Sequence, residues 1–100
     1  MERAIELFRL SVEQGNIVGM SNLGECYYLG NGVEQDYDQA YDLFLLAAEQ
    51  DEQQAQYYLG DMYENGNGVD QDIEEAIIWY RLAAENGSEE AAARLSELDG

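Results

Sequence analysis

Several residue types are scarce or missing in this chain of 100 residues, and each absence excludes a class of site. There is no histidine and only one cysteine, so zinc sites of the usual kinds and internal disulfides are excluded. That cysteine, Cys26, has no histidine or lysine to act as its base, and we interpret it as a small packed core residue. No stretch approaches the roughly 20 apolar residues that span a bilayer, so we expect no direct membrane insertion.

Positive charge is equally scarce. Four arginines and no lysine stand against 22 acidic residues, which gives a formal net charge of −18. Nucleic-acid phosphates and anionic membrane surfaces would be repelled, whereas a cationic peptide or protein surface would be attracted. Alternatively, the acidic side chains only keep the outer helix faces hydrated, or they reflect a salt-rich host. The start Met1-Glu2-Arg3 lacks the basic and apolar segments of a signal peptide, which leaves the compartment open.

A pattern of spaced residues occurs twice, 36 residues apart. The later copy consists of Leu59, Gly60, Tyr63, Gly66, Gly68, Val69, Asp72, Ala76, Trp79, Ala83 and Ala84. The earlier copy consists of Leu23, Gly24, Tyr27, Gly30, Gly32, Val33, Asp36, Ala40, Leu43, Ala47 and Ala48. A fixed period of this size indicates one supersecondary unit that buries its apolar face on its neighbours.

The residue types within a unit predict two antiparallel helices. Ala55, Leu59 and Met62 fall on one stripe of a helix, and Gly60 beside them leaves room for a close neighbouring helix. Gly66 ends that helix, because glycine tolerates the left-handed conformation. Asp72 suits the N-cap of the next helix, with Glu75 completing an acidic capping box, and Trp79-Tyr80 favours packing between helices over a ligand cage.

These residues and spacings resemble the Sel-one-like repeat, a branch of the tetratricopeptide superfamily. The resemblance covers nearly the whole chain and implies an all-α fold, an α-solenoid of antiparallel helix pairs in a right-handed superhelix. Leu7 and Leu43 stand where the family usually has tryptophan, and Asp51 stands where it has glycine. The helix pair remains plausible with these changes, although local packing could loosen.

The predicted domain covers residues 1–100 with about two and three-quarter repeats. It divides into a partial repeat 1–15, repeats 16–51 and 52–87, and a capping helix within 88–100. Six helices and no strands are expected, over residues 3–14, 17–29, 36 to about 50, 52–65, 73–86 and 89–98. Because Ile5, Leu7 and Phe8 would lack a neighbour on one side, we expect a longer array, or a homo-oligomer formed through this N-terminal helix.

The family resemblance also implies a binding surface, since the first helix of each pair lines the concave side of such solenoids. Ten positions opposite the core stripes form the predicted groove: Val18, Ser21, Glu25, Tyr28, Leu29, Gln54, Tyr57, Asp61, Glu64 and Asn65. Carboxylates accept charge-assisted hydrogen bonds from arginine or lysine, and tyrosine rings offer cation–π contact. The groove therefore suits a basic peptide, although the same positions could be ordinary exposed helix residues.

The sequence gives little support for catalysis or for binding of a cofactor or calcium. No nucleophile and base can be assembled, so an enzyme is not expected and a hydrolase comes last among the alternatives. No cofactor is predicted either, because no strand precedes Gly66-x-Gly68, and Asp70, Asp72 and Glu74 lack the glycine and distal glutamate of an EF-hand. We predict a protein–protein interaction module, an adaptor or scaffold. The alternatives are a structural or self-associating scaffold, even an engineered fragment, and an acidic mimic of nucleic acid.

Overall fold

The computed structural model describes residues 17–99, and this part of the chain is helical and contains no strand. Its five helices are α2 (Ile17–Leu29), α3 (Tyr37–Ala48), α4 (Gln53–Asn65), α5 (Ile73–Glu85) and α6 (Glu89–Asp99). Each falls within about two residues of a predicted helix. The predicted helix over residues 3–14, with Ile5, Leu7 and Phe8, lies outside the described residues.

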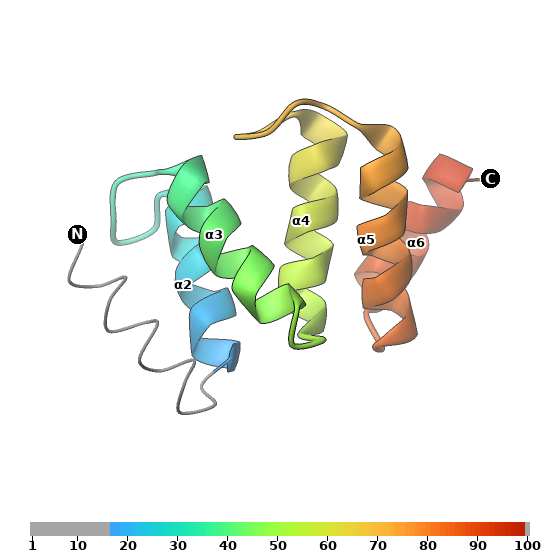
Figure 1. Ribbon diagram of the computed structural model, residues 1–100, viewed down its shortest axis with the longest axis horizontal. Coiled ribbons are helices and arrows are strands. Elements are labelled where there is room, and N and C mark those ends of the chain that lie inside the picture. Colours follow the sequence, from blue (N-terminus) through green and yellow to red (C-terminus); the bar gives the residue numbers. More distant parts are fainter. Residues whose placement is uncertain (1–16, 100) are drawn as a thin grey trace.

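The helices form antiparallel pairs that stand side by side, as Figure 1 shows. Each helix packs on the next one along the chain, and α2 also packs directly on α4. The corresponding helices of the other row, α3 and α5, make at most slight contact with each other. Because α2 approaches α4 more closely than α3 approaches α5, α2 and α4 lie on the inner side of the curve. We refer to α2, α4 and α6, which alternate with α3 and α5 along the chain, as the inner row. This arrangement confirms the predicted solenoid.

The loops that join the paired helices have the same structure in both repeats. Asp36 and Asp72 cap α3 and α5, and their carboxylates accept backbone N–H bonds from the first helical turn. Gly66 ends α4 with a φ of 69°, and Gly30 follows α2 with a φ of 72°, both in the left-handed region. The capping box is only half formed, because the backbone N–H of Asp72 donates to the Tyr63 carbonyl, 2.8 Å away, instead of to Glu75.

Two glycines allow the helices of each pair to approach closely. A Cβ on Gly24 would lie 2.7 Å from a ring carbon of Phe44, and one on Gly60 would lie 2.6 Å from a ring carbon of Tyr80. Phe44 and Tyr80 are both fully buried, and they occupy the same position in successive repeats. The glycines therefore serve the close approach that their spacing predicts.

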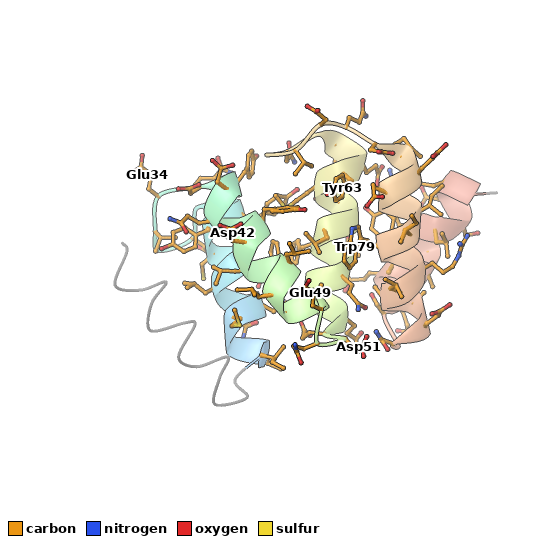
Figure 2. All side chains as sticks on the ribbon, in the orientation of Figure 1. Glu34, Asp42, Glu49, Asp51, Tyr63 and Trp79 are labelled. Carbon is orange, nitrogen blue, oxygen red and sulfur yellow. The ribbon has the colours of Figure 1, made fainter. Side chains whose placement is uncertain are left out.

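The apolar core follows the solenoid in two clusters. The first fills the space between α2, α3 and α4 and includes Tyr27, Leu43 and Leu59, with Trp79 packed against it. The second is built on Tyr80, which lies between α4, α5 and α6. Figure 2 places Trp79 and Tyr63 in the middle of the molecule, which supports an interhelix role for Trp79.

The α2 helix is less enclosed than α4. Tyr27 is buried as predicted, but Gly19, Leu23 and Cys26 are only half-buried. Met62, the counterpart of Cys26, is completely buried, because α4 lies between α3 and α5. Cys26 is therefore a partly exposed free thiol and not the enclosed core residue that the sequence suggested.

Candidate functional site

An open groove of about 540 Å³ crosses the inner row of helices. Its lining is almost entirely polar and consists of Asn22, Glu25, Glu52, Gln53, Gln54, Tyr57, Tyr58, Ser88 and Glu90. These residues come from the middle of α2, the first half of α4 and the start of α6. We refer to this set as the acidic groove.

Helix capping places part of the lining. Glu52 is the N-cap of α4, and its carboxylate accepts the backbone N–H groups of Gln54 and Ala55 at 3.2 and 3.0 Å. The hydroxyl of Ser88 accepts the backbone N–H of Ala91 at 3.1 Å and so caps α6. Two helix N-termini therefore meet at the acidic groove.

The electrostatics of the acidic groove remain negative in spite of those helix ends. Each helix N-terminus carries roughly half a positive elementary charge. Glu25, Glu52 and Glu90 contribute three full negative charges, and the lining contains no arginine. The carboxylates outweigh the helix dipoles, so the acidic groove attracts cations.

The carboxylate of Glu25 joins α2 to α4. One oxygen accepts the Tyr58 hydroxyl at 2.6 Å, and the other accepts the Gln54 side-chain amide at 3.3 Å. Tyr58 stacks on Phe44 with ring centroids 4.8 Å apart, which fixes the position of its ring. Burial raises the pKa of Tyr58, and the hydrogen bond to Glu25 raises it further, so this hydroxyl stays a donor.

Tyr57 and Glu90 provide free polar groups at the acidic groove. The Tyr57 ring lies 5.5 Å from that of Tyr58 in a T-shaped arrangement. Burial raises the pKa of Tyr57, and the carboxylates of Asp61 and Glu90 add to this effect. Within residues 17–99, neither the Tyr57 hydroxyl nor the exposed Glu90 carboxylate has a hydrogen-bond partner of its own.

A second network ties α2 to α4 away from the acidic groove. Tyr28 is buried, and its hydroxyl donates to Asp61 at 2.5 Å and accepts from the Asn67 side chain at 2.9 Å. Asn65, which is exposed, donates its amide to the same Asp61 side chain at 3.1 Å. Burial, followed by the bond to Asp61, raises the pKa of Tyr28.

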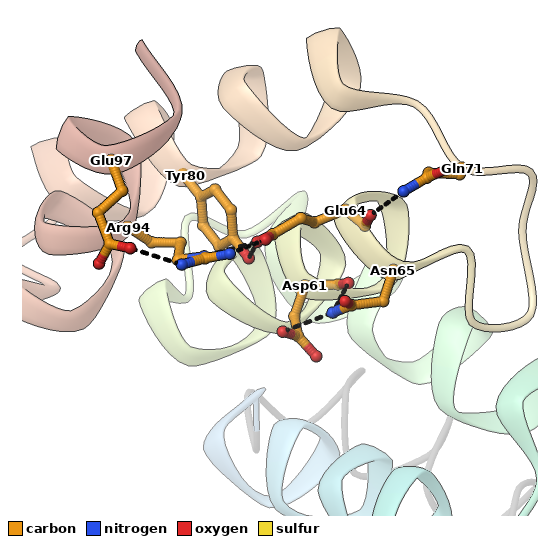
Figure 3. Close-up of polar contacts among 7 residues, drawn as sticks. All are labelled: Asp61, Glu64, Asn65, Gln71, Tyr80, Arg94 and Glu97. Carbon is orange, nitrogen blue, oxygen red and sulfur yellow. Dashed lines mark hydrogen bonds and ion pairs between the residues drawn. The ribbon is translucent and has the colours of Figure 1, made fainter. Parts of the chain in front are cut away.

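A third network holds α4 to α6, and Figure 3 shows its members. Glu64 is buried and accepts the Tyr80 hydroxyl at 2.8 Å and two guanidinium N–H groups of Arg94, with Nε at 2.8 Å. Arg94 also donates to Glu97 at 2.8 Å. The Arg94 hydrogen bond holds the pKa of Glu64 below its usual value, although burial opposes this effect.

The structure distributes the ten predicted groove residues over different environments. Those in the acidic groove are Glu25, Gln54 and Tyr57. Those that are buried are Ser21, Tyr28 and Glu64. Those outside the acidic groove with at least partial exposure are Val18, Leu29, Asp61 and Asn65. The acidic groove thus contains three of the ten predicted residues and lies near the N-terminal ends of α4 and α6, and the binding role of the ten stays a prediction.

Sequence reasoning missed Tyr58 and Glu90. Glu90 occupies the position 36 residues after Gln54, so extending the repeat register into α6 would have found it. Ser88 carried a different signal, since it precedes α6 and serine is a preferred N-cap residue. Glu52 carried no such signal, because glutamate is not among the preferred N-cap residues, although it caps α4 in the structure.

Much of the remaining acidity lies on the other row of helices. Figure 2 shows Glu34, Asp42 and Glu49 along the α3 side of the molecule, and all three are exposed. In the part of the chain that the structure describes, no three histidine, cysteine or acidic side chains are grouped as metal ligands. Each helix in residues 17–99 is too short or too polar to span a bilayer.

Comparison with known proteins agrees with this architecture. The sequence pattern of the Sel1 repeat matches residues 1–16, 17–52 and 53–88. The chain belongs to the Sel1 repeat family. No curated protein matches it by sequence.

Two solved structures of Sel1 repeat proteins resemble the chain. The crystal structure of a Sel1 repeat protein from Oxalobacter formigenes superposes with a TM-score of 0.79 at 34% identity over 93% of this chain. The protein c5321, a protective antigen of uropathogenic Escherichia coli with an SLR fold, superposes with a TM-score of 0.77 at 44% identity over 88% of this chain. The chain spans 38% and 19% of the lengths of these two proteins. Sel1 repeat proteins are helical scaffolds for protein–protein interaction, and the fold is typically non-catalytic.

Proposed function

We propose that this Sel1 repeat chain is an interaction module whose acidic groove receives a cationic segment of a protein partner. The observation that carries the proposal is the combination, in one groove, of three carboxylates, two tyrosine rings and no positive side chain. Carboxylates accept charge-assisted hydrogen bonds from basic side chains, and tyrosine rings attract the same cations.

The overall charge of the molecule supports this choice of partner. A net charge of −18 raises the rate at which a cationic segment meets the protein, and salt weakens the effect because it screens exposed charges. Overall charge cannot direct a partner to one face, however. Specific binding requires the acidic groove to contribute beyond the acidic surface as a whole.

Fluorescence anisotropy with short labelled peptides tests the proposal. A peptide rich in arginine and lysine should bind, and its counterpart with glutamates at the same positions should not. The variant Glu25→Gln/Glu90→Gln removes two negative charges from the acidic groove. The α3 variant, Asp42→Asn/Glu49→Gln, removes two from exposed positions in α3 and at its C-cap.

The affinity of the groove variant for the peptide should fall about tenfold or more. The affinity of the α3 variant should fall only about twofold, because its two charges attract the peptide from a distance without contacting it. Circular dichroism establishes that both variants remain helical, since Glu25 also accepts a hydrogen bond from Tyr58. Equal losses in the two variants would mean that the peptide is held by general acidity, and the acidic groove would then have no role.

A further inference from the structure

Resting on the proposed function, we infer that the acidic groove is specific for a guanidinium group. In this arrangement one arginine of the partner lies against Glu25 and Glu90 and over the ring of Tyr57. A lysine at the same place would bind more weakly. The argument depends on acceptors that the fold leaves free, on an internal arginine that shows the required partners, and on the shape of the guanidinium group.

Acceptor capacity remains at the acidic groove after the internal hydrogen bonds are formed. Each oxygen of Glu25 accepts one bond, and both donors, Tyr58 and Gln54, are neutral. A carboxylate has about four acceptor sites, so Glu25 can take further donors. Glu90 has no hydrogen-bond partner among residues 17–99, and it lines the acidic groove together with Tyr57 and Tyr58.

Arg94 shows how this protein holds a guanidinium group. Its Nε and one terminal nitrogen donate to Glu64, and the other terminal nitrogen donates to Glu97. The Tyr80 hydroxyl donates to the same Glu64 carboxylate, so two carboxylates and a tyrosine surround the cation (Figure 3). The acidic groove presents the same chemical groups without a cation.

No internal cation from the described residues can take that place. Residues 17–99 contain only two arginines and no lysine. Arg94 is committed to Glu64 and Glu97, and Arg81 is an exposed residue of α5, which contributes nothing to the lining. Within residues 17–99, therefore, no side chain supplies a cation to the acidic groove.

The geometry of the cation favours arginine over lysine. A guanidinium group is planar and carries five donors, so it can bridge two carboxylates while its face lies on an aromatic ring. An ammonium group is compact and strongly hydrated, and it cannot stack. A tyrosine ring that lines the same groove as several carboxylates matches the first group better than the second.

The test uses three short peptides with glycine and serine around a single central arginine, lysine or citrulline. Citrulline keeps the shape of arginine and lacks its charge. Each peptide is titrated into the parent chain, Glu90→Gln and Glu89→Gln, and binding is followed by the backbone amide shifts of the groove residues in two-dimensional NMR spectra. Glu89 is the matched control, because it is exposed in the same helical turn and does not line the acidic groove.

The arginine peptide should shift the groove amides, the lysine peptide should bind about threefold or more weakly, and the citrulline peptide should not bind. Glu90→Gln should reduce the affinity for the arginine peptide about five- to tenfold, and Glu89→Gln should reduce it less than about twofold. Equal binding of arginine and lysine at the groove would overturn the guanidinium inference while the proposed function stood. Equal losses in Glu90→Gln and Glu89→Gln would also overturn the guanidinium inference, and the two double variants would then decide the proposed function. Groove amides that move with neither peptide would overturn both.

Discussion

Gly68 and Gly32 offer a matched test of how tightly the two repeats are packed. They occupy the same position in equivalent loops and have nearly the same backbone conformation, with φ values of 79° and 80°. Their surroundings differ. A Cβ on Gly68 would lie 2.6 Å from the Cβ of Tyr37 at the start of α3, whereas no atom of the described residues lies within 4 Å of a Cβ on Gly32.

The expected cost of each alanine substitution follows from these contacts. Both variants place an L-residue in the left-handed region, which costs about 1 kcal/mol and is partly offset by the reduced entropy of the unfolded chain. In Gly68→Ala the new carbon is also about 1 Å closer to its neighbour than ordinary carbon contacts. The Cβ of Tyr37 moves only with its backbone, so the loop or α3 must shift, at about 1–3 kcal/mol. Gly68→Ala should therefore lose about 1–3 kcal/mol more than Gly32→Ala.

Urea unfolding measures the difference. Far-ultraviolet circular dichroism reports helix content, and the fluorescence of Trp79, the only tryptophan, reports the packing of α5 against the first core cluster. Coincident transitions and equal m-values justify the comparison of unfolding free energies. Equal stability of the two variants, or a smaller loss in Gly68→Ala, would contradict the close approach of this loop to α3.

Three further predictions concern strain and ionisation. Asp51 has a φ of 64°, so Asp51→Gly should raise the urea midpoint by the equivalent of about 0.5–1 kcal/mol. Glu64→Gln should destabilise the neutral-pH protein by about 1–3 kcal/mol. Since the folded pKa of Glu64 is lowered, its contribution is complete above the ordinary pKa of glutamate and is lost as pH falls through the folded value, so urea curves of variant and parent should converge in acid. The Tyr41 hydrogen bond, with burial second, raises the pKa of Tyr63 to about 12. Stability should therefore be complete below the ordinary tyrosine pKa of about 10 and fall as pH rises toward 12, and Tyr63→Phe should reduce this alkaline loss in urea titrations.

The features of the fold that depend on a single repeat could be predicted from the sequence. The caps Asp36 and Asp72 and the turn at Gly66 depend on local backbone geometry, which the residue types specify. The need for glycine at Gly60 could be inferred from its place beside a core stripe, but the ring that requires it, Tyr80, could be identified only from the structure. The spacing of residues therefore predicts where the helices of one pair begin and end and which of their faces meet.

The exposure of the predicted groove residues depends on contacts between repeats, which the sequence does not show. The helical pattern predicts that positions opposite the core stripe are exposed, yet Tyr28 and Glu64 are buried. Both are covered from the following unit, Tyr28 by Asn67 and Asp61 and Glu64 by Arg94. A pattern of one helix does not show which of its outward positions a neighbouring helix covers.

These lateral contacts have a consequence for binding, because some groove residues also hold the repeats together. Glu25 joins α2 to α4 through Tyr58, so a cation that competes for this carboxylate also acts on the packing of the two helices. Glu90 accepts no hydrogen bond from another helix among the described residues, so it can bind a cation without weakening an internal contact. Affinity should therefore depend on Glu90 without a matching change in stability, whereas Glu25→Gln should change both. This separation allows the acidic groove to be altered for binding while the solenoid keeps its shape.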